Sequence, residues 1–231
     1  KNVSSAPEDL DKYSRDEAAH YQSVPELVVF PASRNQVSRV LKLCYRKNIP
    51  VTPRGAGTGV TGGAVPVCGG IVMSLEKMNR IIEIDTDNLM AVIEPGVITA
   101  DLKKAAEAHG LFYPPDPASM DTCTLGGNLA ECAGGAMSVK YGVTKDYVLG
   151  LETVLPDGRV LMTGGRTVKG VVGYDLTRLL VGSEGTLGII TKIFLKVLPM
   201  PEATVTLLCT YSHLDDAAQT VSKITSSSII P

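Results

Sequence analysis

The sequence contains no tryptophan, and aromatic residues make up only 5% of its 231 residues. Proteins that hold single-stranded nucleic acid stack its bases on aromatic side chains, so this scarcity argues against that class. The formal net charge is only −2 at pH 7. No broad basic field is therefore present to attract nucleic acid or an anionic membrane surface.

Metal-binding patterns are also lacking. The five cysteines include no CxxC pair, and the three histidines, His20, His109 and His213, lie far apart in the sequence. We therefore expect no metal site, and reduced thiols typical of a cytoplasmic protein. No signal peptide and no long apolar run is visible. Because the first residue is not Met and the last residues, Ile229–Pro231, are apolar, we expect a piece of a longer protein.

Glycine, in contrast, is abundant, with 23 residues. The densest run, Pro53–Gly63, follows a short apolar segment. Glycines allow successive backbone N–H groups to face one concavity, which is typical of phosphate binding. The Rossmann fingerprint does not fit, because Gly62–Pro66 is a poor helix start, and the Walker lysine is absent. The alternative is a glycine-rich surface turn.

Further small-residue segments follow. Thr122–Gly135 would leave backbone bare for a bulky cofactor, although close helix–strand packing selects the same residues. Gly182–Thr191 indicates a loop whose amides face a ligand, in which Glu184 either accepts from a ribose or adenine, fixes the loop, or is simply solvated. Pro114–Pro117 is a rigid segment that would brace a ligand or the loop itself.

The coarse pattern predicts a strand at Glu26–Pro31, a helix capped by Ser33 and Gln36, and a strand at Pro50–Pro53, paired in parallel. Later strands are expected at residues 81–84, 91–94, 148–155, 160–163 and 189–198, with a helix capped by Thr99. Beyond the break at residues 199–201, we expect a strand at 204–210 and a helix at about 214–224.

With these segments assembled, the chain resembles the FAD-binding domain of the vanillyl-alcohol-oxidase (PCMH) type. Within it, the chain more narrowly resembles the D subunit of glycolate oxidase and its relatives, the D-lactate and D-2-hydroxyglutarate dehydrogenases. The matching stretches are Pro53–Gly63, Pro114–Ser119, Thr122–Gly135, Lys140–Gly142, Leu155–Gly158, Lys169–Leu176 and Gly182–Thr191.

The resemblance implies an α+β fold in which FAD lies between two subdomains. A polar N-terminal segment would cover residues 1–23, a small β-α-β subdomain 24–80 and a mixed-sheet subdomain 81–199. Residues 203–231 would begin a C-terminal cap, the substrate domain.

The resemblance also implies a set of FAD-binding residues, with the glycine run around the diphosphate and Gly182–Ile190 near adenine. The set is Pro53, Arg54, Gly55, Ala56, Gly57, Thr58, Gly59, Thr61, Gly62, Pro115, Asp116, Ser119, Thr122, Thr124, Gly126, Gly127, Asn128, Ala133, Gly134, Tyr141, Gly142, Glu184, Gly185, Gly188, Ile189 and Ile190. Because Thr58 stands where covalent members often carry His, FAD is expected to be non-covalent. Valine at Gly57 or Gly127 is expected to displace it, because the added side chain would occupy cofactor space.

The resemblance finally implies an enzyme that oxidises a 2-hydroxy acid (glycolate, D-lactate or D-2-hydroxyglutarate) by hydride transfer to flavin N5. Electrons would pass to a quinone, an iron-sulfur subunit or an electron-transfer flavoprotein, in a homo- or hetero-oligomer. The location would be cytoplasmic, possibly at a membrane surface, or mitochondrial in a eukaryote. No catalytic residue is assigned. The alternatives are a non-catalytic electron-transfer subunit, a truncated module, or another enzyme of this fold, such as an enolpyruvyl-sugar reductase or an alkyl-glycerone-phosphate synthase.

Overall fold

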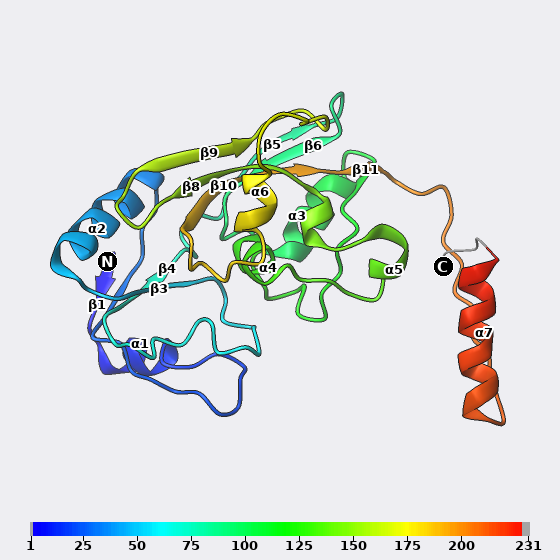
Figure 1. Ribbon diagram of the computed structural model, residues 1–231, viewed down its shortest axis with the longest axis horizontal. Coiled ribbons are helices and arrows are strands. Elements are labelled where there is room, and N and C mark those ends of the chain that lie inside the picture. Colours follow the sequence, from blue (N-terminus) through cyan, green and yellow to red (C-terminus); the bar gives the residue numbers. More distant parts are fainter. Residues whose placement is uncertain (1, 228–231) are drawn as a thin grey trace.

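The computed structural model describes residues 2–227. Helices and strands alternate irregularly along the chain (Figure 1). The strands form two larger sheets and one two-stranded sheet. The α+β class expected from the sequence is confirmed. One of the two larger sheets is built from strands before residue 80 and the other from strands after it.

The first sheet contains three parallel strands and one antiparallel edge strand. Its order is β1 (Val3–Ser4), β2 (Leu27–Val29), β4 (Ile71–Ser74) and β3 (Val51–Arg54). Helix α2 (Arg34–Lys47) buries Val37, Leu41 and Cys44 in one core with Met73 of this sheet. Ser33 caps α2 by accepting from Gln36 N, as the sequence predicts.

Strands β2 and β3 are parallel but are not neighbours, because β4 lies between them. The chain therefore leaves β3 and returns to β4 through residues 55–70, a crossover that contains no helix. Most of the glycine run lies in this crossover. We call residues 55–63 the glycine loop.

The second sheet has five strands and is antiparallel throughout. Its order is β5 (Ile81–Asp85), β6 (Met90–Ile93), β10 (Ile189–Lys196), β8 (Val148–Val154) and β9 (Val160–Gly164). The mixed pairing expected here is corrected: β10 inserts between the hairpins β5–β6 and β8–β9, which leaves no parallel neighbours. Parallel pairs occur in the first sheet.

Helices α3 (Thr99–Glu107) and α4 (Leu125–Glu131) contribute to the core beside the second sheet, with Leu102, Leu125 and Leu129 fully buried. The expected Thr99 cap is not formed, because Thr99 is the first helical residue and its hydroxyl donates to Cys123 O. The remaining elements are α1 (Pro7–Lys12), β7 (Leu111–Phe112), α5 (Ser138–Tyr141), a 3-10 turn (Thr144–Asp146), α6 (Leu176–Leu180) and β11 (Leu198–Pro199).

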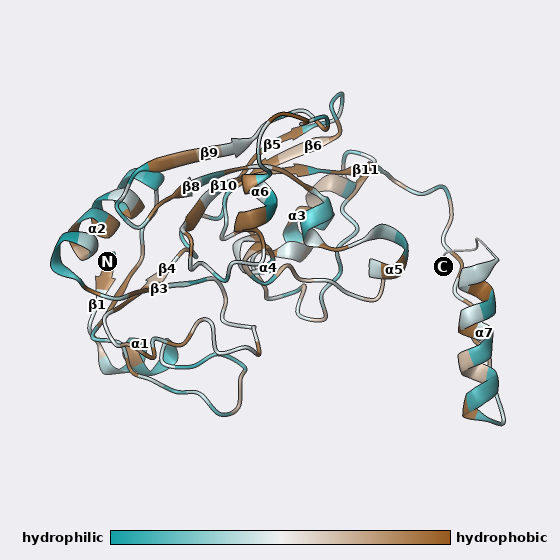
Figure 2. Cartoon of the chain, viewed as in Figure 1, coloured by the Kyte–Doolittle hydropathy of each residue, from teal (hydrophilic) through white to brown (hydrophobic). Residues whose placement is uncertain are grey.

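The C-terminal segment lies apart from the body (Figure 1). Helix α7 (Leu214–Ser226) forms as expected but buries no residue, and teal and brown residues alternate along it in Figure 2. The strand expected at 204–210 is wrong: this stretch is irregular, and Leu207 and Leu208 are exposed. An isolated strand has no ladder partner to satisfy its backbone groups. No helix within residues 2–227 is long and apolar enough to cross a membrane.

Candidate functional site

A groove runs between the first sheet and α4, and it consists of two adjoining hollows of about 220 and 60 Å³. One wall is the glycine loop, and the other is formed by α4 and by residues 182–190, which lead into β10. The hollows share five lining residues, Pro53, Gly55, Gly127, Ala130 and Glu184. Segments that are more than a hundred residues apart in the sequence thus meet in one groove.

Most of the residues expected to bind FAD line this groove. They are Pro53, Arg54, Gly55, Ala56, Gly57, Thr58, Gly59, Thr61, Ser119, Thr124, Gly126, Gly127, Asn128, Ala133, Glu184, Gly185, Gly188, Ile189 and Ile190. The structure therefore brings together three of the segments that the sequence singled out, although which of these residues touch FAD stays a prediction.

Other expected residues do not line the two hollows. They are Gly62, Pro115, Asp116, Thr122, Gly134, Tyr141 and Gly142. Their observed contacts are structural: Asp116 accepts from Met137 N at 3.2 Å, and the Tyr141 ring packs edge-on against Phe112. Gly62 lies against the ring of Tyr21.

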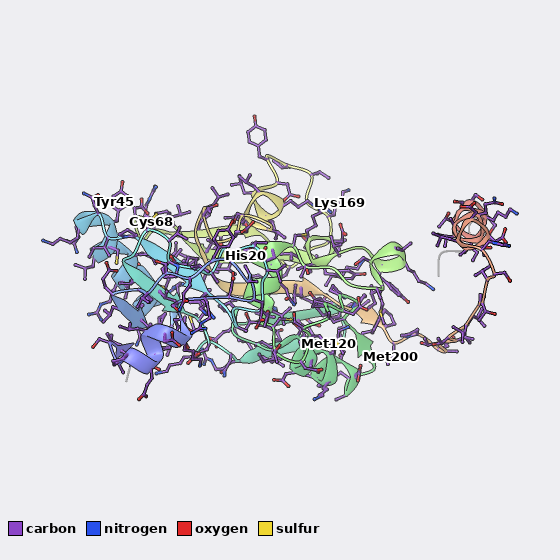
Figure 3. The ribbon with its side chains drawn as sticks, turned by 90° about the horizontal axis from the view of Figure 1, so that it is seen from below. His20, Tyr45, Cys68, Met120, Lys169 and Met200 are labelled. Carbon is purple, nitrogen blue, oxygen red and sulfur yellow. The ribbon has the colours of Figure 1, made fainter. Side chains whose placement is uncertain are left out.

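Several lining residues were absent from the expected set. They are Asp16, Val60, Gly63, Ala64, Leu75, Pro95, Pro117, Cys123, Ala130, Glu131 and Ser183. Glu131 carried a usable signal, because it is the only charged residue in Thr122–Gly135. No sequence signal pointed to Asp16, because it belongs to a polar segment that reaches the glycine loop only in the folded chain. Glu17 N donates to Gly59 O at 3.0 Å, and Figure 3 shows His20 of this segment over the middle of the molecule.

Arg54 lies behind the glycine loop, with 7% of its surface exposed. Its Nη1 donates to Arg15 O at 2.6 Å, and its guanidinium lies 5.3 Å from the centre of the Tyr13 ring. Burial lowers the pKa of Arg54, while the nearby Tyr13 and Asp16 oppose that shift. The side chain therefore ties the loop to the N-terminal segment and places a positive charge beneath it.

Gly57 has a φ of +78°, and a Cβ there would lie 2.1 Å from Arg54 Nη2. The expected reason for the effect of valine at Gly57 is thus corrected. The added side chain would meet the guanidinium behind the loop rather than the space in front of it. At Gly127 the expected reason stays a prediction: a Cβ there would meet Thr124 Oγ1 at 3.3 Å and no other atom within 4 Å.

Helix α4 is held by contacts that leave one face open to the groove. Thr124 caps it by accepting from Gly127 N, and Gly126 N donates to Pro95 O at 2.7 Å. Asn128 is 3% exposed, and its Nδ2 donates to Thr99 Oγ1 at 2.6 Å. These bonds anchor α4 to α3 and to the chain after β6.

The segment 182–185 is bonded directly to the end of α4. Gly182 N donates to Leu129 O at 2.8 Å, and Glu184 N donates to Ala130 O at 3.0 Å. Glu184 adopts a left-handed φ of +51°, which is uncommon for a residue with a side chain. Its carboxylate faces the glycine loop, since a Cβ at Gly63 would lie 2.6 Å from Glu184 Oε2.

A groove of bare main chain and small side chains suits a bulky, phosphate-bearing ligand. The family described as "FAD binding domain" matches residues 25–164. The chain belongs to this family, and its cofactor is FAD. The expected resemblance to the PCMH-type domain is confirmed.

The relatives are about twice as long as this chain. The chain is 50% identical to the glycolate oxidase subunit GlcD of Bacillus subtilis, over 98% of this chain and 50% of that protein. It is 45% identical to a D-lactate dehydrogenase of Anaerostipes hadrus, over 96% of this chain and 46% of that protein. A solved alkyldihydroxyacetonephosphate synthase superposes with a TM-score of 0.86 at 26% identity, over 100% of this chain and 44% of that one. The chain thus spans about half the length of the proteins it matches.

The residues present fit FAD in most respects. The groove is lined largely by Gly, Ala and Thr, and the open space in front of Gly127 is the kind of cradle that a side chain would fill. Backbone N–H groups of a glycine loop bind phosphate oxygens well. One feature opposes a diphosphate: three carboxylates, of Asp16, Glu131 and Glu184, line the same hollow.

Proposed function

We propose that this chain is the FAD-binding half of a flavoprotein that oxidises a small 2-hydroxy acid. The observation that carries the proposal is the groove of bare backbone between the first sheet and α4, in a chain that is 50% identical to a glycolate oxidase subunit. The substrates in the names of the relatives, glycolate and D-lactate, are both 2-hydroxycarboxylates. FAD supplies a two-electron acceptor when it is bound, as flavins do in such reactions.

In this proposal the chain's own residues hold and orient the cofactor. The glycine loop binds the diphosphate through main-chain N–H groups, and Arg54, whose guanidinium lies against Gly57, adds positive charge. Gly127 and Ala130 leave space for the ring system or its ribityl chain. Leu75, Pro95, Ile189 and Ile190 give the smaller hollow an apolar lining suited to the adenine. The groups that bind the acid and take its hydroxyl proton are expected in the other half of the polypeptide.

The proposed FAD is non-covalent. Cys123 is the one cysteine among the lining residues of the two hollows. It is 3% exposed, and its Sγ lies 3.2 Å from Thr99 Oγ1. A thiol buried in that way is a packing group rather than an attachment point. The reduced flavin is proposed to pass electrons to a separate acceptor, whose identity is a matter for experiment.

A second function is supported by the fold comparison. Alkyldihydroxyacetonephosphate synthase has a similar backbone over the whole of this chain, so a related group-transfer enzyme is the alternative. The higher identity to the two hydroxy-acid enzymes favours oxidation. A carrier that holds FAD without turnover is the third possibility.

The test uses the full-length polypeptide that contains this chain, purified with FAD and kept free of oxygen. Glycolate, D-lactate and D-2-hydroxyglutarate are added separately, and the oxidised flavin absorbance near its visible maximum is followed. Bleaching by one of the D-hydroxy acids or glycolate, but not by its 2-oxo product, supports the proposal. A yellow protein that none of them bleaches would refute it and leave the transferase or carrier.

A further inference from the structure

The glycine loop carries a hydroxyl that two carboxylates approach together. Thr61 Oγ1 lies 3.2 Å from Glu131 Oε1 and 3.3 Å from Glu184 Oε2. The same oxygen accepts from Gly63 N at 3.2 Å. The three groups come from the glycine loop, the end of α4 and the segment 182–185, so this contact spans the groove.

One hydroxyl has a single proton to donate. It satisfies one of the two carboxylates and leaves the other facing an oxygen. That second contact becomes a hydrogen bond only if the remaining carboxyl group brings its own proton. Both contacts of the Thr61 hydroxyl are therefore hydrogen bonds only when one of the two carboxyl groups, of Glu131 or Glu184, is protonated. When both carboxylates are ionised, one contact is a repulsion between oxygen atoms.

The charges around the cluster also favour protonation of one carboxyl group. Asp16 lines the same hollow from the N-terminal segment, and its Oδ2 is buried without a hydrogen-bond partner among the described residues. Arg54 is the cation that faces Asp16, from behind the loop. Three carboxylates and one guanidinium give a local charge of about −2, and like charges at short range disfavour ionisation. Loss of hydration, and then the charge of Glu184, raise the pKa of Glu131. The hydrogen bond from Thr61 opposes this shift, and the charge of Asp16 adds to it.

We propose that FAD binding in this groove is coupled to the uptake of a proton by the Glu131–Thr61–Glu184 cluster. The inference rests on the diphosphate lying against the glycine loop, as the proposed function has it. Two further negative charges next to an already anionic cluster make the protonated form bind FAD more tightly than the ionised form. Glu131 and Glu184 are then residues that set the affinity for the cofactor as a function of pH.

The direction of the pH dependence follows from linkage. The carboxyl pKa is higher in the FAD complex than in the apo-protein, so affinity is full below the apo-protein's pKa. It falls as pH rises between the two pKa values, by at most tenfold per pH unit for one proton. Above the pKa of the complex it is level again. The loss between pH 5 and pH 8 is expected to be about tenfold, as one pKa unit of coupling gives.

The experiment is an FAD titration of the apo form of the full-length polypeptide, followed by quenching of flavin fluorescence at fixed ionic strength from pH 5 to pH 8. Calorimetry in buffers of different ionisation enthalpy gives the proton number directly. We expect uptake of a fraction of one proton per FAD in the wild type. Glu131→Gln and Glu184→Gln should flatten the pH profile and bind FAD more tightly at pH 8. Glu107→Gln, an exposed change at the end of α3, is the matched control and should behave as the wild type.

A flat wild-type profile with no proton uptake would overturn the proposal, as would weaker FAD binding by both Gln variants at pH 8 with unchanged thermal unfolding. The latter result would mean that the ionised carboxylates accept hydrogen bonds from FAD hydroxyls. Failure of the proposed FAD placement looks different, since Gly127→Ala would then leave the affinity unchanged at every pH. An FAD affinity that is sensitive to Gly127 but independent of pH would remove only the proton coupling.

Discussion

A Cβ at Gly126 would lie 2.7 Å from the Cβ of Pro95, whereas a Cβ at the adjacent Gly127 would meet only the Thr124 hydroxyl, at 3.3 Å. Two neighbouring glycines of α4 therefore have different reasons for lacking a side chain. Gly126 allows the helix to approach the chain after β6, and Gly127 keeps the groove open. The sequence presents them as one pair, and the structure separates their roles.

This difference gives a matched pair of variants. Gly127→Ala is expected to weaken FAD binding by at least about tenfold, ~1.4 kcal/mol, because its methyl group enters the groove. The apo-protein should change little in stability, because the preference of about 0.5–1 kcal/mol for alanine over glycine in a helix offsets the tight 3.3 Å contact of the added Cβ with the capping hydroxyl of Thr124. Gly126→Ala should instead lower the free energy of unfolding by about 1–3 kcal/mol through overpacking.

FAD titration and thermal unfolding of the two apo-proteins check both statements. Full FAD affinity in Gly127→Ala would place the cofactor elsewhere.

Replacing Gly57 tests the support behind the glycine loop. Gly57→Ala combines a positive φ with a Cβ only 2.1 Å from Arg54 Nη2, so it should displace the guanidinium and its bond to Arg15 O. We expect a stability loss clearly above the ~1–2 kcal/mol cost of the left-handed backbone alone, together with weaker FAD binding.

Gly110→Ala is the control for this experiment, because Gly110 has a φ of +70° and no atom near its added Cβ. Chemical denaturation of both variants separates strain from the clash. Equal losses in the two proteins would show that Arg54 moves aside without cost.

The buried hydroxyl of Thr99 holds α4 in place. It accepts from Asn128 Nδ2 at 2.6 Å, and both residues are buried. Thr99→Val keeps the shape but leaves the Asn128 amide without this partner, which costs about 1–3 kcal/mol. Urea unfolding should show that loss, and an unchanged unfolding midpoint would mean that a water replaces the hydroxyl.

Removal of the cofactor tests how it is attached. Acid precipitation of the yellow full-length protein should release all flavin into the supernatant, because no covalent link is expected. Cys123→Ala should release it in the same way and should retain FAD before precipitation. Yellow colour that stays with the wild-type pellet and not with the Cys123→Ala pellet would identify Cys123 as an attachment point.

Local chemistry made several features of this protein predictable from sequence. The Ser33 cap of α2, the two β-hairpins and the strand that begins at Ile189 all depend on residues close together in the chain. The glycine loop and its place between two strands were likewise predictable, because an unusual density of glycine excludes regular structure and exposes amides. The family resemblance then followed from the order of such segments.

What depends on distant contacts was not predictable in this way. Hydrophobic pattern shows that a strand exists but not which strand lies beside it, so the insertion of β4 between β2 and β3, and of β10 between two hairpins, was decided only by the packed fold. The stretch 204–210 shows the reverse case, in which a strand-like pattern without a partner stays irregular.

By itself, the sequence determined the chemical character of each segment: bare amides at the glycine loop, small residues in α4, and a lone charge at Glu131 and at Glu184. The tertiary structure decided how these characters combine. In the folded chain Arg54 donates to Arg15 O, Asp16 lines the same hollow as the glycine loop, and the carboxylates of Glu131 and Glu184 both contact the Thr61 hydroxyl. The physical reason is that electrostatic and hydrogen-bond energies depend on distances in space. Residues that lie 39, 70 and 123 positions apart in the sequence come within hydrogen-bond distance only when the whole chain has packed.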